Sequence, residues 1–176
     1  MRLQRGVFLG VSLLMATGLV QSQPAWAGSV GLMAKARKGS SKVMVDFEGF
    51  AVDLTLSSRA KQVLTDRKET IIVAAYFTGR PRPDTDKMLV SDMGEIGLGD
   101  AKVEVAPGQS AKFERVSLDQ KALDQSLDKN PILLINVYSG RKSSKDNLLD
   151  CGIYEDDLKP IQGKSIPIAC KLIGEQ

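Results

Sequence analysis

Apolar and polar residues alternate through much of the chain after residue 42, and this alternation predicts a mainly β protein. In residues 43–47 the apolar side chains stand at odd positions, and from Phe50 to Leu56 they stand at even positions. The phase changes at Glu48–Gly49, where one extra residue with a glycine indicates a β-bulge or a tight bend. We therefore expect two half-buried strand segments in this part of the chain.

Further strands follow along the sequence. Residues 70–80 (TIIVAAYFTGR) are almost continuously apolar, which is typical of a central strand with both faces covered. Residues 95–108 predict a strand with a glycine irregularity, and residues 111–118 predict an alternating strand. A proline-broken loop at residues 80–92 and a turn at residues 106–109 separate these strands.

Two short helices are predicted between strands. Residues 57–68 (SSRAKQVLTDRK) place apolar side chains at helical spacing behind serines that are able to cap a helix. The second helix follows Asp119, which is placed as an N-cap, with Leu118 and Leu123 placed as a hydrophobic staple. Each helix would cross from one strand to the next.

Two apolar runs of the chain end in nearly the same residues. Residues 71–80 end in YFTGR, and residues 132–141, found 61 positions later, end in VYSGR. Upstream, residues 54–60 align with residues 116–122 at 62 positions. Each unit then holds a strand, a short helix, a central strand and a Gly-Arg exit. We interpret this as a twofold internal repeat, with chance similarity between apolar strands as the alternative.

These elements predict a single-domain antiparallel β-sandwich with Greek-key connections, two short crossing helices and an internal pseudo-twofold repeat. Residues 147–158 add one short strand and residues 164–173 add a terminal strand. The layout is compatible with transthyretin-like, C2-like or immunoglobulin-like sandwiches. This is a likeness of architecture, which does not by itself imply a function.

The N-terminal sequence predicts export. Residues 1–27 have a positive start, an uncharged apolar stretch and a small-x-small AWA ending, as a signal peptide does, with a retained N-terminal anchor as the alternative. Residues 28–42 carry four basic side chains without a clear period and predict a flexible basic arm. Residues 43–176 form the predicted sandwich domain. The expected location is the periplasm or the exterior, with no membrane span after cleavage.

Cys151 and Cys170 are the two cysteines of the chain. In an exported protein such a pair predicts a disulfide, here one that joins the two C-terminal strands. A metal site or a redox couple is the alternative. The chain lacks both CxxC spacing and the histidine that would complete a zinc site, so the disulfide is favoured.

Charge and composition exclude several classes of function. The chain has no histidine, which excludes a Ser-His-Asp triad, a Cys-His nucleophile and an imidazole zinc site. Without Arg2 and Arg5 of the signal peptide, 22 of the 24 basic residues remain against 21 acidic ones, a net charge of +1. A dedicated nucleic-acid-binding protein would show a basic excess, so nucleic acid is not an expected partner.

Two catalytic or metal-binding alternatives remain in the sequence. Ser139 and Lys142 fit the S-x-x-K pattern, in which a lysine activates a serine, although known users have further motifs and a larger scaffold. Two acidic groups, Asp84 with Asp86 and Asp92, or Glu155 to Asp157, offer oxygen ligands for Ca²⁺ without the spacing of a known calcium loop. We expect no cofactor.

The Gly-Arg exits suggest a binding site instead. If both central strands end at one pole of the sandwich, their basic residues would gather there, and guanidinium groups suit carboxylate or phosphate. Exits at opposite poles would exclude a shared site. The predicted binding residues are Arg80, Arg82, Arg141, Lys142 and Lys145.

The favoured function is therefore that of an exported, non-catalytic binding or adaptor protein of a bacterial-type envelope. Its expected partner is an envelope protein or an anionic surface. A histidine-free hydrolase or metal-dependent enzyme that uses the acidic loops is one alternative. A small-ligand carrier or an inhibitor of an envelope enzyme is another.

Overall fold

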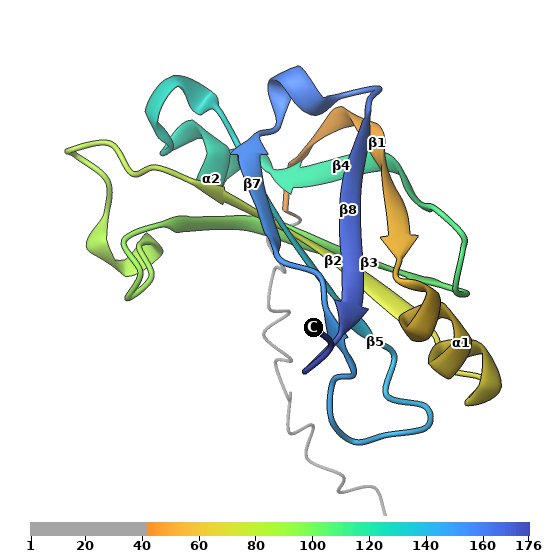
Figure 1. Cartoon of the computed structure of the whole chain (residues 1–176). Helices are drawn as coiled ribbons and strands as arrows, with labels where there is room; N and C mark the ends of the chain where they lie inside the picture. Colours follow the sequence, from red (N-terminus) through yellow and green to blue (C-terminus); the bar gives the residue numbers. More distant parts are fainter. Residues whose placement is uncertain (1–41) are drawn as a thin grey trace, which may run out of the picture. The chain divides into compact units, whose positions relative to one another are not determined.

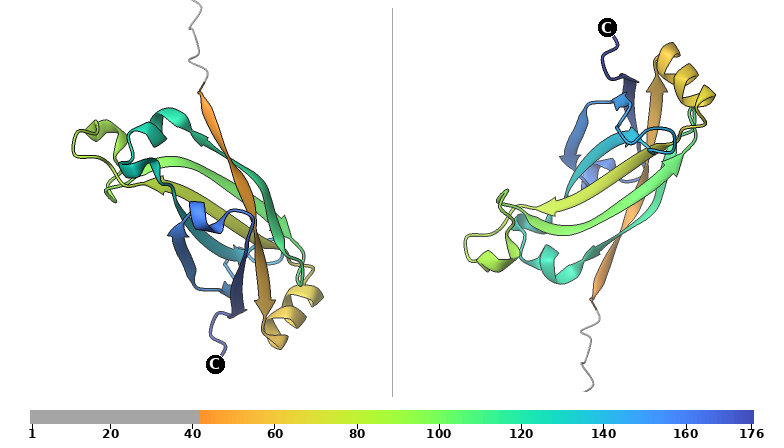
Figure 2. Two further views of the ribbon diagram at one scale, coloured as in Figure 1. Left: turned by 90° about the horizontal axis from the view of Figure 1, so that it is seen from above. Right: turned by 90° about the horizontal axis from the view of Figure 1, so that it is seen from below.

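The alternating segments of the sequence form two four-stranded sheets. The structure, a computed structural model, describes residues 42–176, so the predicted signal peptide and the arm up to residue 41 lie outside it. One sheet has the strand order β4-β1-β8-β6 and the other the order β3-β2-β5-β7 (Figures 1 and 2). The chain is thus mainly β and sandwich-like, as predicted. The strands are β1 (Met44–Leu56), β2 (Ile71–Gly79), β3 (Ile96–Val105), β4 (Ala111–Asp119), β5 (Ile132–Ser139), β6 (Leu149–Asp150), β7 (Ile153–Asp157) and β8 (Ser165–Leu172).

The two predicted helices are present and have the predicted caps. α1 (Ser58–Asp66) begins after Ser57, whose Oγ accepts a hydrogen bond of 3.0 Å from the backbone N–H of Ala60. α2 (Gln120–Asp124) begins after Asp119, whose carboxylate accepts one of 3.1 Å from the N–H of Ala122. Three single turns of 3-10 helix complete the described elements: η1 (Lys87–Leu89), η2 (Leu127–Lys129) and η3 (Lys159–Ile161).

The first sheet is mixed, which corrects the expectation of a purely antiparallel sandwich. β1 and β8 run parallel, from the pair Ala51 and Ser165 to the pair Leu56 and Cys170. The other strand pairs in residues 42–176 are antiparallel. Two parallel neighbours need a long connection between them. Here the connection consists of all the elements between β1, the first strand, and β8, the last strand. The Greek-key connection is not confirmed.

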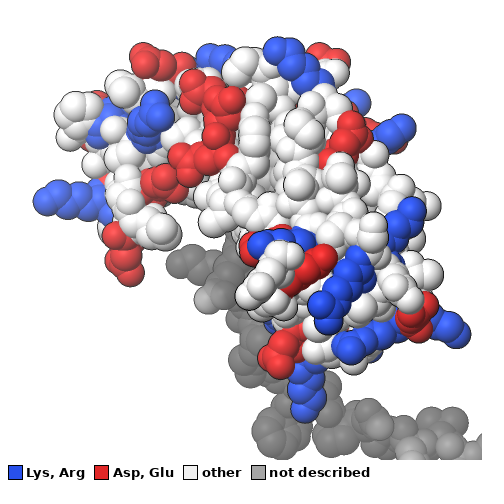
Figure 3. Space-filling view, viewed as in Figure 1, with Lys and Arg blue, Asp and Glu red and all other residues white. Residues whose placement is uncertain are grey.

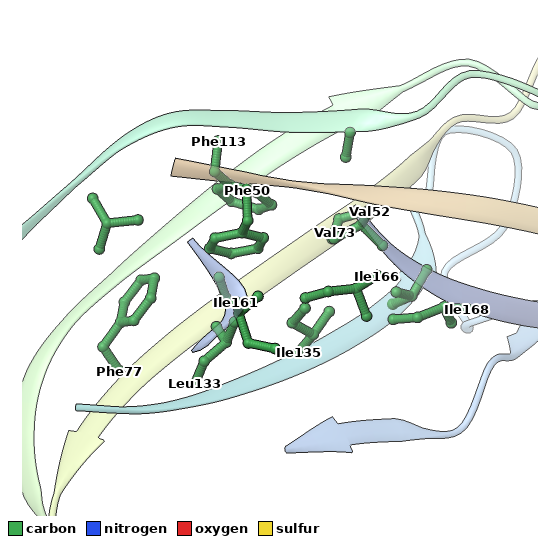
Figure 4. Close-up of a cluster of buried hydrophobic side chains, with 14 of the residues drawn as sticks. Phe50, Val52, Val73, Phe77, Phe113, Leu133, Ile135, Ile161, Ile166 and Ile168 are labelled. Carbon is green, nitrogen blue, oxygen red and sulfur yellow. The ribbon is translucent and has the colours of Figure 1, made fainter. Parts of the chain in front are cut away.

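The core lies between the two sheets and is filled by aliphatic and phenylalanine side chains (Figure 4). Phe50 from β1 and Phe113 from β4 stack with ring centroids 4.8 Å apart. Leu133 and Ile135 face them from β5 in the opposite sheet, and Ile161 comes from the η3 turn (Figure 4). Burial of these side chains removes apolar surface from water and holds the layers together.

The change of phase in β1 is a tight bend that β4 shares. Glu48 lies opposite Arg115 and Phe50 lies opposite Phe113, so the register is the same on both sides of Gly49. The inward face nevertheless moves by one position in both strands at this point. A Cβ at Gly49 would lie 1.6 Å from the carbonyl oxygen of Phe113. Glycine therefore permits the close approach of the two backbones, and no residue is inserted.

The glycine irregularity predicted in residues 95–108 is a β-bulge. Phe77 of β2 pairs with Gly99 of β3, and the next residue, Thr78, pairs with Gly97. Leu98 is thus the extra residue on β3, and it is buried in the core. The glycines on both sides of Leu98 therefore predicted the position of this irregularity correctly.

β2 is apolar on both faces, and the described residues cover one face fully and the other in part. The odd-numbered residues from Ile71 to Phe77 belong to the core. Tyr76 and Ile72 point to the other face and stay half-buried, as does Tyr138 on β5. The right panel of Figure 2 shows β2 and β3 in front, with α1 and α2 at the ends and no helix across the sheet. Ala74 on this outer face is nevertheless fully buried, so the prediction of two covered faces holds only in part within residues 42–176.

The internal repeat is not confirmed. At the offset of 61 residues, Val73 aligns with Leu134 and Phe77 aligns with Tyr138, yet the first of each pair is in the core and the second faces outward. A slip of one residue along a strand exchanges its two faces. The aligned residues are therefore similar in type, but one of each pair is in the core and the other is not. Corresponding elements do lie side by side, since β1 pairs with β4 and β2 pairs with β5.

The predicted disulfide between Cys151 and Cys170 is present. Cys151 directly follows β6, and Cys170 lies in β8, the strand that pairs with β6. The bond therefore links β8, the last strand, to the segment directly after β6. Within the described residues, no helix has the length and apolar character needed to cross a membrane.

The protein is expected to show no free thiol. Labelling of denatured, unreduced protein with a thiol reagent should modify neither cysteine, because each is bonded to the other. After reduction the same reagent should modify both, which serves as the positive control. Two labelled thiols per chain before reduction would show that the bond does not form in the protein.

Candidate binding site

The five basic residues predicted to form one binding set lie at two ends of the molecule. β2 and β5 are antiparallel neighbours, with Ile71 opposite Ser139 and Thr78 opposite Ile132. Their Gly-Arg exits therefore leave the sheet at opposite ends. The two exits do not share one pole of the sandwich, as the binding-site prediction required. One end holds Arg80 and Arg82, and the other holds Arg141, Lys142 and Lys145.

The Arg80–Arg82 end uses its second arginine to build the fold. The Arg82 guanidinium binds the Asp84 carboxylate at 3.1 Å and donates at 3.0 Å to the backbone carbonyl of Asp124, the last residue of α2. The backbone N–H of Arg82 also donates to the carbonyl of Gln125. This side chain attaches the long β2–β3 loop to α2, so Arg82 is committed to an internal role.

At the other end, arginines of α1 join the predicted group. α1, the β5–β6 loop and the end of β8 lie together in Figures 1 and 2, and Lys and Arg gather over α1 in Figure 3. Arg59 and Arg67 from the α1 segment and Arg141 from the loop form no salt bridge within residues 42–176. Lys142, by contrast, binds Glu104 at 3.0 Å. We call this end of the molecule the basic end.

The first hollow at the basic end lies on the outer face of the second sheet and has a volume of about 270 Å³. Tyr76 on β2 and Tyr138 on β5 stand two residue pairs apart on that face, and Asn136 lies between them. Their polar groups and the Arg141 guanidinium are suited to an anionic or hydroxyl-bearing group. The lining residues are Tyr76, Asn136, Tyr138, Arg141 and Asn147.

The second hollow adjoins the first and is a groove of about 360 Å³ beside α1. Its lining combines two guanidinium groups from the α1 segment with aliphatic side chains from the helix, the β5–β6 loop and the C-terminal end. Ile173 is 60% exposed although it is a large apolar residue. Asn147 lines both hollows. The groove residues are Arg59, Val63, Arg67, Asn147, Leu148, Leu172 and Ile173.

A buried carboxylate holds the loop that carries Arg141. Glu69 follows α1 and is 2% exposed. It accepts hydrogen bonds from the backbone N–H groups of Thr70 at 3.0 Å, Lys142 at 2.9 Å and Ser143 at 2.7 Å, and from the Ser143 hydroxyl at 2.6 Å. Burial raises the pKa of Glu69, but these four hydrogen bonds outweigh it and lower the pKa to about 2.

This carboxylate supports a strained position in the loop. Arg141 has a φ of 59°, in the left-handed region that residues with a side chain rarely adopt. The next two residues, Lys142 and Ser143, are the ones that donate to Glu69. The fold therefore stabilises an unfavourable backbone conformation at the residue that presents a guanidinium to the first hollow. Such strain is often found at functional positions.

Asn147 closes the other side of the loop. Its Oδ1 accepts hydrogen bonds from the backbone N–H of Ser139 at 2.9 Å and of Leu149 at 3.1 Å, and its Nδ2 donates to the Leu149 carbonyl at 2.7 Å. The side chain thus caps β5 where β7 no longer pairs with it. Hydrogen bonds within the chain therefore fix the β5–β6 loop on both sides, at Glu69 and at Asn147.

The S-x-x-K pattern does not bring its two residues together. Ser139 is fully buried, and its Oγ donates to Asn147 Oδ1 and accepts from the N–H of Leu148. The Lys142 ammonium instead binds Glu104 at the surface. A buried hydroxyl that is fully engaged in hydrogen bonds, with its lysine directed elsewhere, does not form an activated nucleophile.

The acidic alternatives are dispersed. Asp84 binds Arg82, and Asp86 caps η1 by accepting from the N–H of Met88 at 2.9 Å. Glu155 to Asp157 lie on β7, where successive side chains point to opposite faces. Across residues 42–176, no three Asp, Glu or Cys side chains gather as a metal site would require.

A larger hollow, about 500 Å³, lies beside the disulfide. Its lining is dominated by small side chains and backbone, and its two charged residues, Asp150 and Lys171, are paired across β6 and β8 and have opposite sign. It therefore offers no group of convergent donors, and size alone does not favour it over the basic end.

Sequence reasoning identified Arg141 but missed its neighbours at the basic end. Arg59 and Arg67 lie eight residues apart in a predicted helix, a spacing that places both on one face together with Val63. That signal was readable in the sequence. Glu69 gave no such signal, since an acidic residue between a helix and a strand reads as a solvated charge.

The chain matches no protein-family model, no curated protein and no solved structure.

Proposed function

We propose that the protein is an exported, non-catalytic binding protein that docks an acidic segment of a partner protein at its basic end. One observation carries this proposal: Arg59, Arg67 and Arg141 surround two adjoining hollows and have no ion-pair partner within residues 42–176. Guanidinium groups bind carboxylates through two parallel hydrogen bonds. An occupant that carries carboxylates would supply the missing partners.

The composition of the basic end favours a protein segment over an anionic surface. Glu104 and Asp146 lie among the basic residues of this end, and recognition of a charged membrane usually rests on larger clusters of Lys and Arg. The apolar walls of the groove, with Leu148 and Ile173, fit a partner that also brings apolar side chains. Both features favour local contacts with a few carboxylates.

Export belongs to this proposal as well. The first 27 residues read as a signal peptide, and the disulfide is compatible with an oxidising compartment. A non-catalytic role is proposed because the chain has no histidine, and because Ser139 is buried with its hydroxyl engaged in hydrogen bonds. The partner would then be another protein of the envelope or the exterior.

The variant in which Arg59, Arg67 and Arg141 are all replaced by Gln is expected to lose its partner while it remains folded. The protein is immobilised, an envelope extract is passed over it, and retained proteins are identified and quantified by mass spectrometry. A partner held by the wild type should be retained at least tenfold less by this variant, because one lost charge-assisted contact alone is worth about 1.5–3 kcal/mol. The melting temperature should change little, since exposed charges contribute about 0–1 kcal/mol to stability.

Arg80→Gln is the matched control, because Arg80 is also exposed and forms no salt bridge with any residue from 42 to 176, but lies at the opposite end of β2. It should retain the partner as the wild type does. Equal retention by the wild type and the triple variant would overturn the proposal. Loss of the partner with Arg80→Gln alone would move the binding site to the other end of the sheet.

A further inference from the structure

We propose that the groove beside α1 accepts an extended segment of the partner in which two acidic side chains flank one apolar side chain at alternate positions, in the order acidic–x–apolar–x–acidic. This inference rests on the proposed function and specifies the partner that the groove selects. It depends on the spacing of three residues along α1 and on the size of the groove.

The first part of the argument is the spacing of the groove residues. Arg59 and Val63 of α1 and the C-cap residue Arg67 follow each other at intervals of four residues and lie along one face of the helix. At a rise of about 1.5 Å per residue, the two arginines are rooted about 12 Å apart, with Val63 about 6 Å from each. The groove therefore presents a cation, an apolar surface and a second cation in a line.

An extended chain has the matching period. Side chains on one face of a strand recur at every second residue, with a step of about 6.6 Å, and four residues span about 13 Å. An acidic residue at the first position would then meet Arg59 or Arg67, an apolar residue two positions later would lie over Val63, and a second acidic residue would meet the other arginine. The groove therefore specifies three positions of the segment and leaves its other positions free to vary.

The size of the groove favours an extended segment over a helix. A helix with its side chains is about 10–12 Å wide, and it would have to enter a groove of about 360 Å³ that is bounded by the C-terminal end and the β5–β6 loop. An extended strand is about 4.8 Å wide within a sheet and inserts one side chain at a time. Leu148 and Ile173 supply the walls that the central apolar side chain would contact.

An acidic residue close to Arg59, Glu175, already has hydrogen-bond partners. Glu175 accepts hydrogen bonds of 2.8 Å from the Ser57 hydroxyl and from the backbone N–H of Leu172. It thereby fixes the C-terminal wall of the groove, and it forms no salt bridge with Arg59. The hydrogen bonds from Leu172 and Ser57 lower the pKa of Glu175 most, and the charge of Arg59 adds a smaller contribution. The Arg59 guanidinium forms no salt bridge within residues 42–176 and can still bind a carboxylate of the partner.

Three labelled peptides of defined sequence test this inference by fluorescence anisotropy with the full exported chain. The alternating peptide is Ser-Glu-Ser-Leu-Ser-Glu-Ser. The compact peptide, Ser-Ser-Glu-Leu-Glu-Ser-Ser, has the same composition with both acids beside the leucine. A helical peptide carries Glu, Leu and Glu at intervals of four residues. The alternating peptide should bind at least tenfold more tightly than the compact one.

The double variant with Arg59→Gln and Arg67→Gln should remove this tenfold preference, while Arg80→Gln should preserve it. Equal binding of the alternating and compact peptides, with both weakened in the double variant, would overturn the spacing and leave the proposed function intact. Tighter binding of the helical peptide would overturn the extended geometry in the same way. If no peptide binds but partner capture still depends on the arginines, the inference fails and the proposed function stands. If neither peptide binding nor partner capture changes when the arginines are replaced, the inference and the proposed function are both overturned.

Discussion

Gly49→Ala is expected to lower the free energy of unfolding by more than about 3 kcal/mol, which is beyond the range of ordinary surface substitutions. The added Cβ would lie 1.6 Å from the carbonyl oxygen of Phe113 and 2.6 Å from the carbonyl carbon and oxygen of Glu114. All of these atoms belong to the backbone, so no side chain can rotate away. β1 and β4 would have to separate at the place where Phe50 and Phe113 stack.

The measurement is urea unfolding followed by circular dichroism, with Gly97→Ala as the matched control. Gly97 also lies in a strand, but a Cβ there meets no atom within 4 Å and its backbone is not left-handed. The control should stay within about 0.5 kcal/mol of the wild type. A Gly49→Ala protein as stable as Gly97→Ala would show that the strands do not approach as closely as described.

Glu69→Gln is expected to destabilise the protein by about 3 kcal/mol at neutral pH and to loosen the loop that carries Arg141. The folded state lowers the pKa of Glu69 from an ordinary 4.5 to about 2, and each pKa unit corresponds to about 1.4 kcal/mol. The carboxylate accepts from three backbone N–H groups and one hydroxyl. A glutamine has one acceptor oxygen and would turn an amide donor toward these donors.

The effect should disappear in acid. Because the pKa of Glu69 is lower in the folded state than in the unfolded chain, its contribution is fully present above about pH 4.5 and is lost as the pH falls toward 2. The wild type and Glu69→Gln should therefore differ by about 3 kcal/mol at pH 7 and become similarly stable near pH 2. Urea unfolding at several pH values measures this difference.

A second readout separates the loop from global stability. Hydrogen exchange at the N–H groups of Lys142 and Ser143 should be slow in the wild type and fast in Glu69→Gln, because both donate to this carboxylate. Glu104→Gln is the neighbouring control, since Glu104 is exposed and binds the Lys142 side chain. It should leave exchange at both positions slow. A difference between wild type and Glu69→Gln that is constant from pH 7 to pH 2 would contradict the assigned role.

The candidate site was only partly readable in the sequence. Arg141 was found because it ends an apolar run, and a strand end leaves its side chain at the surface. Arg80 and Arg82 were grouped with it on the assumption that two similar strands end at the same pole. β2 and β5 are antiparallel neighbours, so the assumption failed, and the loop that carries Arg141 is instead bound by Glu69, directly after α1.

The sequence by itself determined the elements whose signals are local. The alternation of apolar side chains, the Ser57 and Asp119 caps, the glycines around Leu98 and the Cys151–Cys170 pair each depend on nearby residues or on simple chemistry, and all appear in the structure. These signals act through backbone geometry within a few residues. They hold whatever the remainder of the chain does.

Only the tertiary structure decided which strands are neighbours and in which direction they run. The parallel pair of β1 and β8, the opposite ends of the two Gly-Arg exits and the burial of Glu69 arise from contacts between residues far apart in the chain. The face of each strand depends on its pairing, and a slip of one residue reverses it, which is why YFTGR and VYSGR matched in letters and not in environment. Local patterns carry no information about such pairings, because many arrangements bury the same apolar faces.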